Sequence, residues 1–214
     1  MTKKDKPMVT QNPKVVSPSP EKFPSAAPFC RVGMVLLVCV ALFAGCGAGD
    51  PKSVEALENI QHQDEAFRLQ GLNTLSRMGD KAKPHADKVA ALLKDTSPKV
   101  RSLAALLLGI WRHSSPEVVQ ELSTMAAGDE DAAARAGALQ TLSKLGANDE
   151  FAKVVKGILA GDDADLKSET LMTIGESTSK ESVTAVKAEL EAIAGGSDKD
   201  LAAEAKIALE MIEE

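Results

Sequence analysis

Apolar residues recur at helical spacing from about residue 53 to the end of the chain. Five segments start on an apolar residue, carry a small residue four positions later, and carry a large apolar residue eight positions later. Positions separated by four and eight residues lie on one face of an α-helix. The pattern therefore predicts five helices, with origins at Phe67, Val100, Ala134, Leu166 and Leu201.

The five segments are copies of one unit. Residues 68–79 and 135–146 share Arg, Leu, Thr, Leu, Ser and Gly at an offset of 67 residues, about two units of 33–34 residues. Such a period is typical of stacked helix pairs, because each pair can bury its apolar stripe only against its neighbours. A helical bundle with coincidental spacing is the alternative.

A second set of helices is expected between the first. Ser97-Pro98 and Ser115-Pro116 place a capping hydroxyl before a proline at the first helical position, and Thr178 with Glu181 resembles a capping box. Glycines follow several of the predicted helix ends. The predicted members of this set are residues 53–61, 84–94, 116–126, 149–160 and 179–193.

The repeated unit resembles HEAT-like repeats of the short bacterial type that is also seen in phycobilisome lyase subunits. Asp95, Val100, Arg101 and Ala104 form the copy that matches best, and the resemblance covers residues 53–214. It implies an all-α fold, an α-solenoid of about four to five HEAT-like helix pairs. It also implies that the second set of helices lines a concave face, where a protein or peptide partner docks.

Composition narrows the classes of partner. Aromatic residues make up 3% of the chain, and there is no Tyr, so base stacking on aromatic rings is disfavoured. Residues 1–45 carry a net charge of +4, and the remaining residues hold 19 basic and 29 acidic side chains, a net charge of −10. An acidic body repels phosphate backbones, which excludes nucleic acid as the expected partner.

The N-terminal region has the pattern of a secretion signal. Residues 1–31 are rich in Lys, Pro and Ser and are interpreted as a disordered basic n-region, and an uncharged apolar run of 13 residues follows at 32–44. The run is shorter than the roughly 20 residues that span a bilayer, and it has the length of a signal-peptide h-region. A buried core helix and an uncleaved anchor are the alternatives.

The end of this run resembles the lipobox of bacterial lipoproteins. Leu42, Phe43, Ala44 and Gly45 precede Cys46, so that residues 32–45 comprise the h-region and the lipobox, although Phe43 stands where the family usually has Leu. The resemblance implies that Cys46 is acylated and becomes the mature N-terminus. Residues 46–52 are then a tether, and the protein is anchored by lipid in the bacterial envelope, facing the periplasm or the exterior.

The acidic body shows no pattern typical of catalysis or of a resident cofactor. All three cysteines lie at or before Cys46, which excludes a cysteine-based metal site in the body, and His62, His85 and His113 lack metal-ligand spacing. We therefore expect no catalytic residues, no metal and no cofactor. Trp111 is expected to be partly buried core rather than a binding anchor.

Two charged features recur once per repeat. Acidic clusters at 129–131, 162–165 and 198–200 precede origin helices and are interpreted as helix caps, with binding of a cation or of a basic partner as the alternative. The basic residue after each of the first four origins is interpreted as part of a structural ladder that pairs with neighbouring Asp residues, with a ligand site as the alternative. Its members are Arg68, Arg101, Arg135 and Lys167.

The combined prediction is a lipid-anchored envelope protein whose repeats form a non-enzymatic scaffold for protein–protein interaction. The alternatives are a lyase-like or chaperone-like helper that acts on a client protein and a purely structural component of the envelope. The sequence assigns no binding residues and no particular partner.

Overall fold

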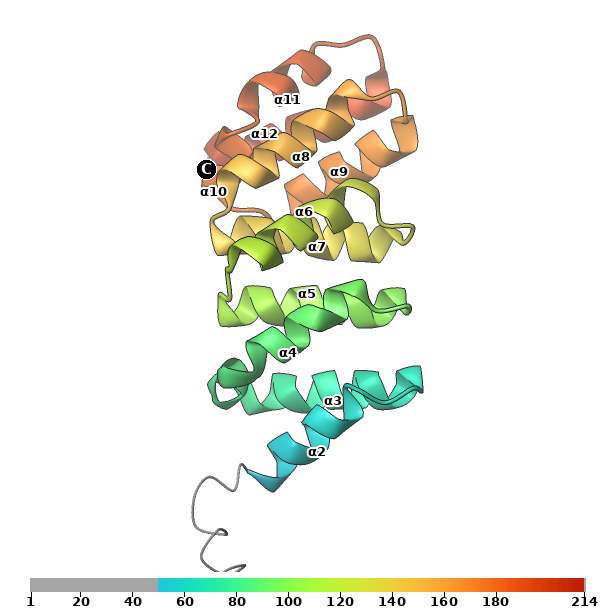
Figure 1. Cartoon of the computed structure of the whole chain (residues 1–214). Helices are drawn as coiled ribbons and strands as arrows, with labels where there is room; N and C mark the ends of the chain where they lie inside the picture. Colours follow the sequence, from blue (N-terminus) through green and yellow to red (C-terminus); the bar gives the residue numbers. More distant parts are fainter. Residues whose placement is uncertain (1–49, 214) are drawn as a thin grey trace, which may run out of the picture. The chain divides into compact units, whose positions relative to one another are not determined.

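The computed structural model describes residues 50–213, and every regular element in that range is helical (Figure 1). The described residues belong to one compact unit of the chain, Ala48–Glu214. The predicted n-region, h-region, lipobox and Cys46 lie outside the described residues.

The described helices form five consecutive pairs, which confirms the predicted all-α solenoid. From the first pair to the fourth, the first helices are α2 (Pro51–Asn59), α4 (Ala86–Ala90), α6 (Pro116–Gly128) and α8 (Asn148–Ala160). In the fifth pair, α10 (Lys180–Thr184) and α11 (Lys187–Ala194) together take this place. The second helix is α3 (Glu65–Met78), α5 (Pro98–Trp111), α7 (Ala132–Leu145), α9 (Ala164–Ser177) or α12 (Lys199–Glu213).

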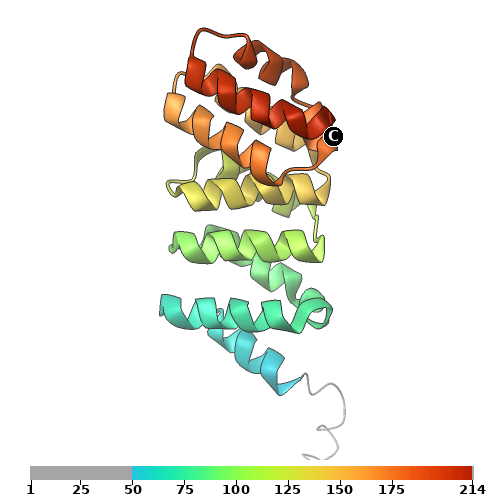
Figure 2. The same cartoon turned by 180° about the vertical axis from the view of Figure 1, so that it is seen from behind.

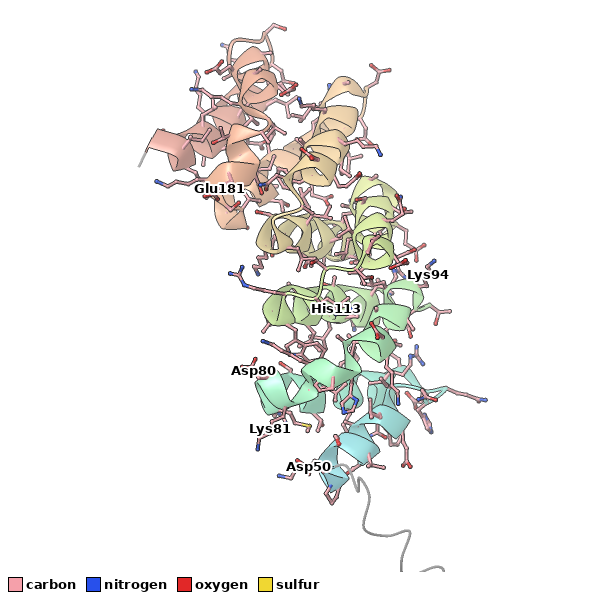
Figure 3. All side chains as sticks on the ribbon, turned by 60° about the vertical axis from the view of Figure 1, so that its left-hand side comes forward. Asp50, Asp80, Lys81, Lys94, His113 and Glu181 are labelled. Carbon is pink, nitrogen blue, oxygen red and sulfur yellow. The ribbon has the colours of Figure 1, made fainter. Side chains whose placement is uncertain are left out.

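The pairs stack into two layers. Seen from behind, the second helices lie side by side as one sheet-like layer from α3 to α12 (Figure 2). The first helices cover the other side, with α2 at one end of the stack and the last pair at the other (Figure 1). Figure 3 marks Asp50, which caps α2, and Glu181 of the last pair.

Two predicted first helices are interrupted. Residues 84–94 form only the short α4 between the 3₁₀ helices η1 (Gly79–His85) and η2 (Ala91–Lys94). Pro84 lies inside η1, and the regular α-helix begins only at Ala86. In the last pair the helix breaks at Ala185 and Val186.

Side-chain caps set most helix starts as predicted. Ser97 Oγ accepts from Val100 N and Ser115 Oγ accepts from Val118 N, each before a proline in the first turn. Asp50 caps α2, which begins at Pro51, two residues before the predicted start.

The predicted capping box at Thr178 is wrong. Ser179 is the N-cap of α10, and its Oγ accepts from Ser182 N at 3.2 Å. The buried Thr178 hydroxyl instead donates to Ile174 O at 2.8 Å and satisfies a carbonyl in the last turn of α9.

The predicted seam between the layers is present in the first four pairs. The large apolar residues eight positions after the origins, Leu75, Leu108, Leu142 and Ile174, are fully buried. In the fifth pair Leu209 is only half-buried and Ala208 is fully buried instead. The register of the contact therefore moves by one residue in α12.

Gly71 shows why the position four residues after an origin is small. A Cβ on Gly71 would lie 2.7 Å from the backbone oxygen of Ala56 and 2.7 Å from Ile60 Cγ2. Backbone atoms cannot give way as a flexible side chain can, so α2 and α3 approach this closely only because residue 71 has no side chain.

In α12, the side that faces the next repeat in the earlier second helices lies at the end of the stack and has a different composition. Position five after the origin faces the next repeat and is buried at Leu72, Ala105, Leu139 and Leu171. In α12 this position is the exposed Lys206. A polar side toward the end of the stack is typical of a helix that closes a repeat array against solvent.

Three of the second helices each end at a residue in the left-handed region. The position twelve residues after the origin has a positive φ at Gly79 (57°), Arg112 (54°) and Gly146 (71°). The left-handed region costs a residue with a Cβ roughly 1–2 kcal/mol, and glycine is the usual residue there.

Replacing Arg112 with glycine is therefore expected to raise the free energy of unfolding by about 0.5–1 kcal/mol, since the strain exceeds the extra entropy of glycine in the unfolded chain. Gly146→Ala, at the same position of the next pair, is expected to lower it by about 1 kcal/mol. Urea unfolding followed by circular dichroism measures both, and a loss of stability in Arg112→Gly would contradict the assigned strain.

Candidate interaction surface

An arginine ladder ties each of the first three repeats to the next. Arg101 donates from Nε and from one terminal nitrogen to the two carboxylate oxygens of Asp129, at 2.7 and 2.6 Å. Its other terminal nitrogen donates to the backbone oxygens of Asp95 and Thr96 in its own repeat. Arg68 pairs with Asp95 through one terminal nitrogen, at 2.7 Å, while its Nε has no hydrogen-bond partner among the described residues. The predicted structural role is thus confirmed for these two arginines.

The third link uses a different carboxylate. Gly161 stands where Asp95 and Asp129 stand in the preceding repeats, and Arg135 pairs with Glu169 of α9 instead. The Arg135 guanidinium also donates to Asp129 O at 2.6 Å, as the other arginines do to their own loops. Lys167, the fourth predicted member, makes no ion pair among the described residues.

The acidic clusters act as helix caps, as predicted. Asp131 Oδ1 accepts from Ala134 N at 2.9 Å, Asp163 Oδ1 accepts from Leu166 N at 3.0 Å, and Asp198 Oδ1 accepts from Leu201 N at 3.2 Å. Within residues 50–213, no three His, Cys, Asp or Glu side chains gather closely enough to hold a metal ion.

The ladder lowers the pKa of the Asp129 carboxyl below its ordinary value. Burial alone would raise this pKa, since the side chain is only 7% exposed. The hydrogen bond from Arg101 and that from the Asp131 N–H outweigh burial, and the charges of Arg101 and Arg135 act in the same direction.

This shift predicts a specific loss of stability in acid. A carboxyl with a lowered folded pKa stabilises the fold above its unfolded pKa of about 3.9, and that contribution is lost as the pH falls through the folded pKa. The wild-type protein is therefore expected to lose more stability than Asp129→Asn between about pH 5 and pH 3. Urea midpoints at several pH values measure the difference, and parallel profiles would contradict it.

The single tryptophan is buried in the core, and two of the histidines contact side chains or backbone of their own region. Trp111 is 5% exposed at the end of α5, which confirms its predicted place in the core. The His62 ring lies 4.3 Å from the Phe67 ring, and His62 Nδ1 accepts from Asp64 N. His113, labelled in Figure 3, has its Nε2 3.0 Å from Asp87 Oδ1.

Exposed apolar side chains concentrate on the layer of second helices. We call the positions three, six and ten residues after each origin the outer face, because they lie opposite the buried seam. Ile110 of α5 is 63% exposed, Met172 of α9 is 50% exposed, and Ile207 of α12 is 56% exposed. Leu103 and Leu106 of α5 lie half-buried on the same face.

The layer of first helices carries an open groove. It has a volume of about 670 Å³ and runs between α6 and α8. Of the large aliphatic side chains that line it, Val154 and Ile158 are each only 8% exposed, and Leu166 is half-buried. A partner in this groove therefore gains little burial from Val154 and Ile158, whereas the outer face offers large exposed side chains.

The sequence assigned no binding residues, and Ile110, Met172 and Ile207 were missed. Their signal was present, since all three are large apolar residues six or ten positions after an origin, on the side of the helix away from the predicted stripe. Apolar residues scattered singly on a surface are common, and only the stacking of repeats places Met172 beside Ile207.

Comparison of the chain with family models supports the repeat architecture. The family model for HEAT repeats matches residues 86–175, which run from α4 into α9. Proteins of known structure that are similar include an engineered protein determined by the Northeast Structural Genomics Consortium, with 15% sequence identity and a TM-score of 0.48 over 77% of this chain and 80% of that chain. No curated protein sequence matches the chain.

The fold is therefore an all-α solenoid whose central part, residues 86–175, is similar to HEAT repeats. HEAT repeats usually mediate protein–protein interaction. None of the described helices combines the length and hydrophobicity that crossing a bilayer requires.

Proposed function

We propose that this protein is a lipid-anchored scaffold of the bacterial envelope, which binds a protein partner without catalysing a reaction. The partner docks on the outer face of the second helices. The observation that carries this proposal is the set of large, exposed apolar side chains on that face of a HEAT-repeat stack.

The sequence analysis favoured docking on the first helices of the pairs, whereas we place the docking surface on the second helices. The predicted set corresponds to the first helices, whose groove is lined by Val154 and Ile158, which are already buried. Fully burying one large aliphatic side chain contributes about 1.5–3 kcal/mol, so Ile110, Met172 and Ile207 can supply a useful part of a binding free energy.

Affinity capture from membranes, followed by mass spectrometry, tests the docking face. We expect the wild-type protein and Thr124→Asp, an exposed change in the groove of the first helices, to capture the same partner. Ile110→Asp is expected to lose it, because a charge replaces apolar contact area. Retention of the partner by Ile110→Asp and its loss from Thr124→Asp would contradict the proposed face.

The lipid anchor rests on the sequence that ends at Cys46. The uncharged run at 32–44 and the small residues before Cys46 support recognition and acylation of that thiol. Metabolic labelling with a palmitate analogue is expected to modify the wild-type protein and not Cys46→Ser. An unlabelled wild-type protein would remove the anchor from the proposal and leave the docking face to be tested separately.

A further inference from the structure

The junction between α9 and α12 contains an incomplete rung of the ladder. Glu204 of α12 occupies the position that Glu169 occupies in α9, three residues after the origin. Arg135 meets Glu169 with two nitrogens, but the residue equivalent to Arg135 in the fourth repeat is Lys167, which makes no ion pair in the described unit. The carboxylate of Glu204 is therefore left without the cation that its counterpart has.

Only one oxygen of this carboxylate has a partner. Ser168 Oγ donates to Glu204 Oε1 at 2.7 Å. Glu204 Oε2 is inaccessible to solvent and has no hydrogen-bond partner among the described residues. An oxygen in this state is costly for the fold, and a donor that reaches it gains a charge-assisted hydrogen bond.

A small cavity opens beside Glu204 on the outer face. It has a volume of about 160 Å³ and is lined by Leu171, Met172, Gly175, Glu176, Glu204 and Ile207. Met172 and Ile207 are its exposed apolar residues, and Glu176 adds a second carboxylate. No basic side chain lines the cavity.

We propose that this cavity binds an arginine or lysine side chain of a protein partner, which completes the open rung. The methylene groups of that side chain pack against Met172 and Ile207, and the half-buried Glu204 side chain turns toward the cavity so that its carboxylate meets the charged end. The Arg135–Glu169 pair shows, one repeat earlier, that a guanidinium is held by a glutamate at this position. The inference rests on the proposed function in taking the partner to be a protein.

Charge complementarity favours this occupant over an apolar one. Long basic side chains combine an apolar stem with a charged end, and the cavity offers apolar walls together with two carboxylates. An aliphatic side chain would fill the same volume but leave Glu204 Oε2 without a donor.

Methyl NMR of the full-length protein in detergent micelles tests the site with a defined probe. The methionine methyl groups are labelled with ¹³C, so that Met172 reports on the cavity, while Met78 and Met125 report on other repeats. The probe is a pentapeptide with arginine between two leucines, and its neutral control has citrulline in place of arginine.

We expect the arginine peptide to shift the Met172 signal saturably and the citrulline peptide to bind at least about tenfold more weakly, the loss expected when a charge-assisted hydrogen bond is removed. Glu204→Gln is expected to weaken the arginine peptide by a similar factor. Glu210→Gln, an exposed change in the same helix, serves as the matched control and is expected to leave the affinity unchanged.

Equal affinity for the two peptides, or unchanged affinity in Glu204→Gln, would overturn the proposal. Binding that emerges only in Lys167→Met would also overturn it, because Lys167 then closes the rung within the chain. If membrane capture still depends on Ile110 while Glu204→Gln has no effect on the peptide, the cation site fails and the proposed docking function stands.

Discussion

Replacing Arg101 with alanine is expected to lower the free energy of unfolding by about 3–5 kcal/mol, the usual cost of removing one partner of a buried ion pair. Asp129 would remain buried without its bidentate partner, and the backbone oxygens of Asp95 and Thr96 would lose a donor. Urea unfolding followed by circular dichroism measures the change.

Two further variants separate the ion pair from general effects of removing arginine. Arg77→Ala, at an exposed position near the end of α3, is expected to cost less than about 1 kcal/mol. The double variant Arg101→Met with Asp129→Leu is expected to regain much of the lost stability, because well-packed apolar residues can replace a buried pair. A cost for Arg101→Ala no greater than that for Arg77→Ala would show that the ladder does not hold the repeats together.

Replacing Phe151 with alanine is expected to lower the free energy of unfolding by about 3–5 kcal/mol. Phe151 is fully buried in α8, which packs against helices of its own and both neighbouring repeats, so the cavity left by its ring cannot readily collapse. The same unfolding measurement applies.

Phe67→Ala is the matched control, because the Phe67 ring is 42% exposed. Its expected cost is about 1 kcal/mol, from partial burial and the contact with His62. If the two phenylalanine variants lost equal stability, the central repeats would not form the densely packed core that the structure shows.

The repeat period in the sequence predicted most of the fold. Five origins with small and large apolar residues at fixed offsets correctly placed all five second helices and the seam through Leu75, Leu108, Leu142 and Ile174. The breaks in two first helices were missed. Pro84 stood at the predicted helix start, where proline is common, so it did not mark the first break. The pattern around Ala185 and Val186 remains apolar through the second break.

The ladder was recognisable in part. Arg68 and Arg101 pair with acidic residues that precede the next second helix, as their spacing predicted. The exchange of partners at Gly161 was not foreseen, because a lost carboxylate at one position and a new one at Glu169 form one site only after the repeats stack. The sequence did not show that Glu204 lacks a cation, because this follows only from comparing Glu204 with Glu169 in the stacked repeats.

Site-specific photo-crosslinking in living cells tests the central claim, that a protein partner docks on the outer face of the second helices. A photoreactive amino acid is placed at Ile110, Met172 or Ile207, and in matched variants at Thr124, Lys153 or Lys156 on the first helices. The account predicts one crosslinked protein shared by the first three variants and absent from the matched ones. A shared crosslink only from the first helices, or none from the outer face, would contradict it.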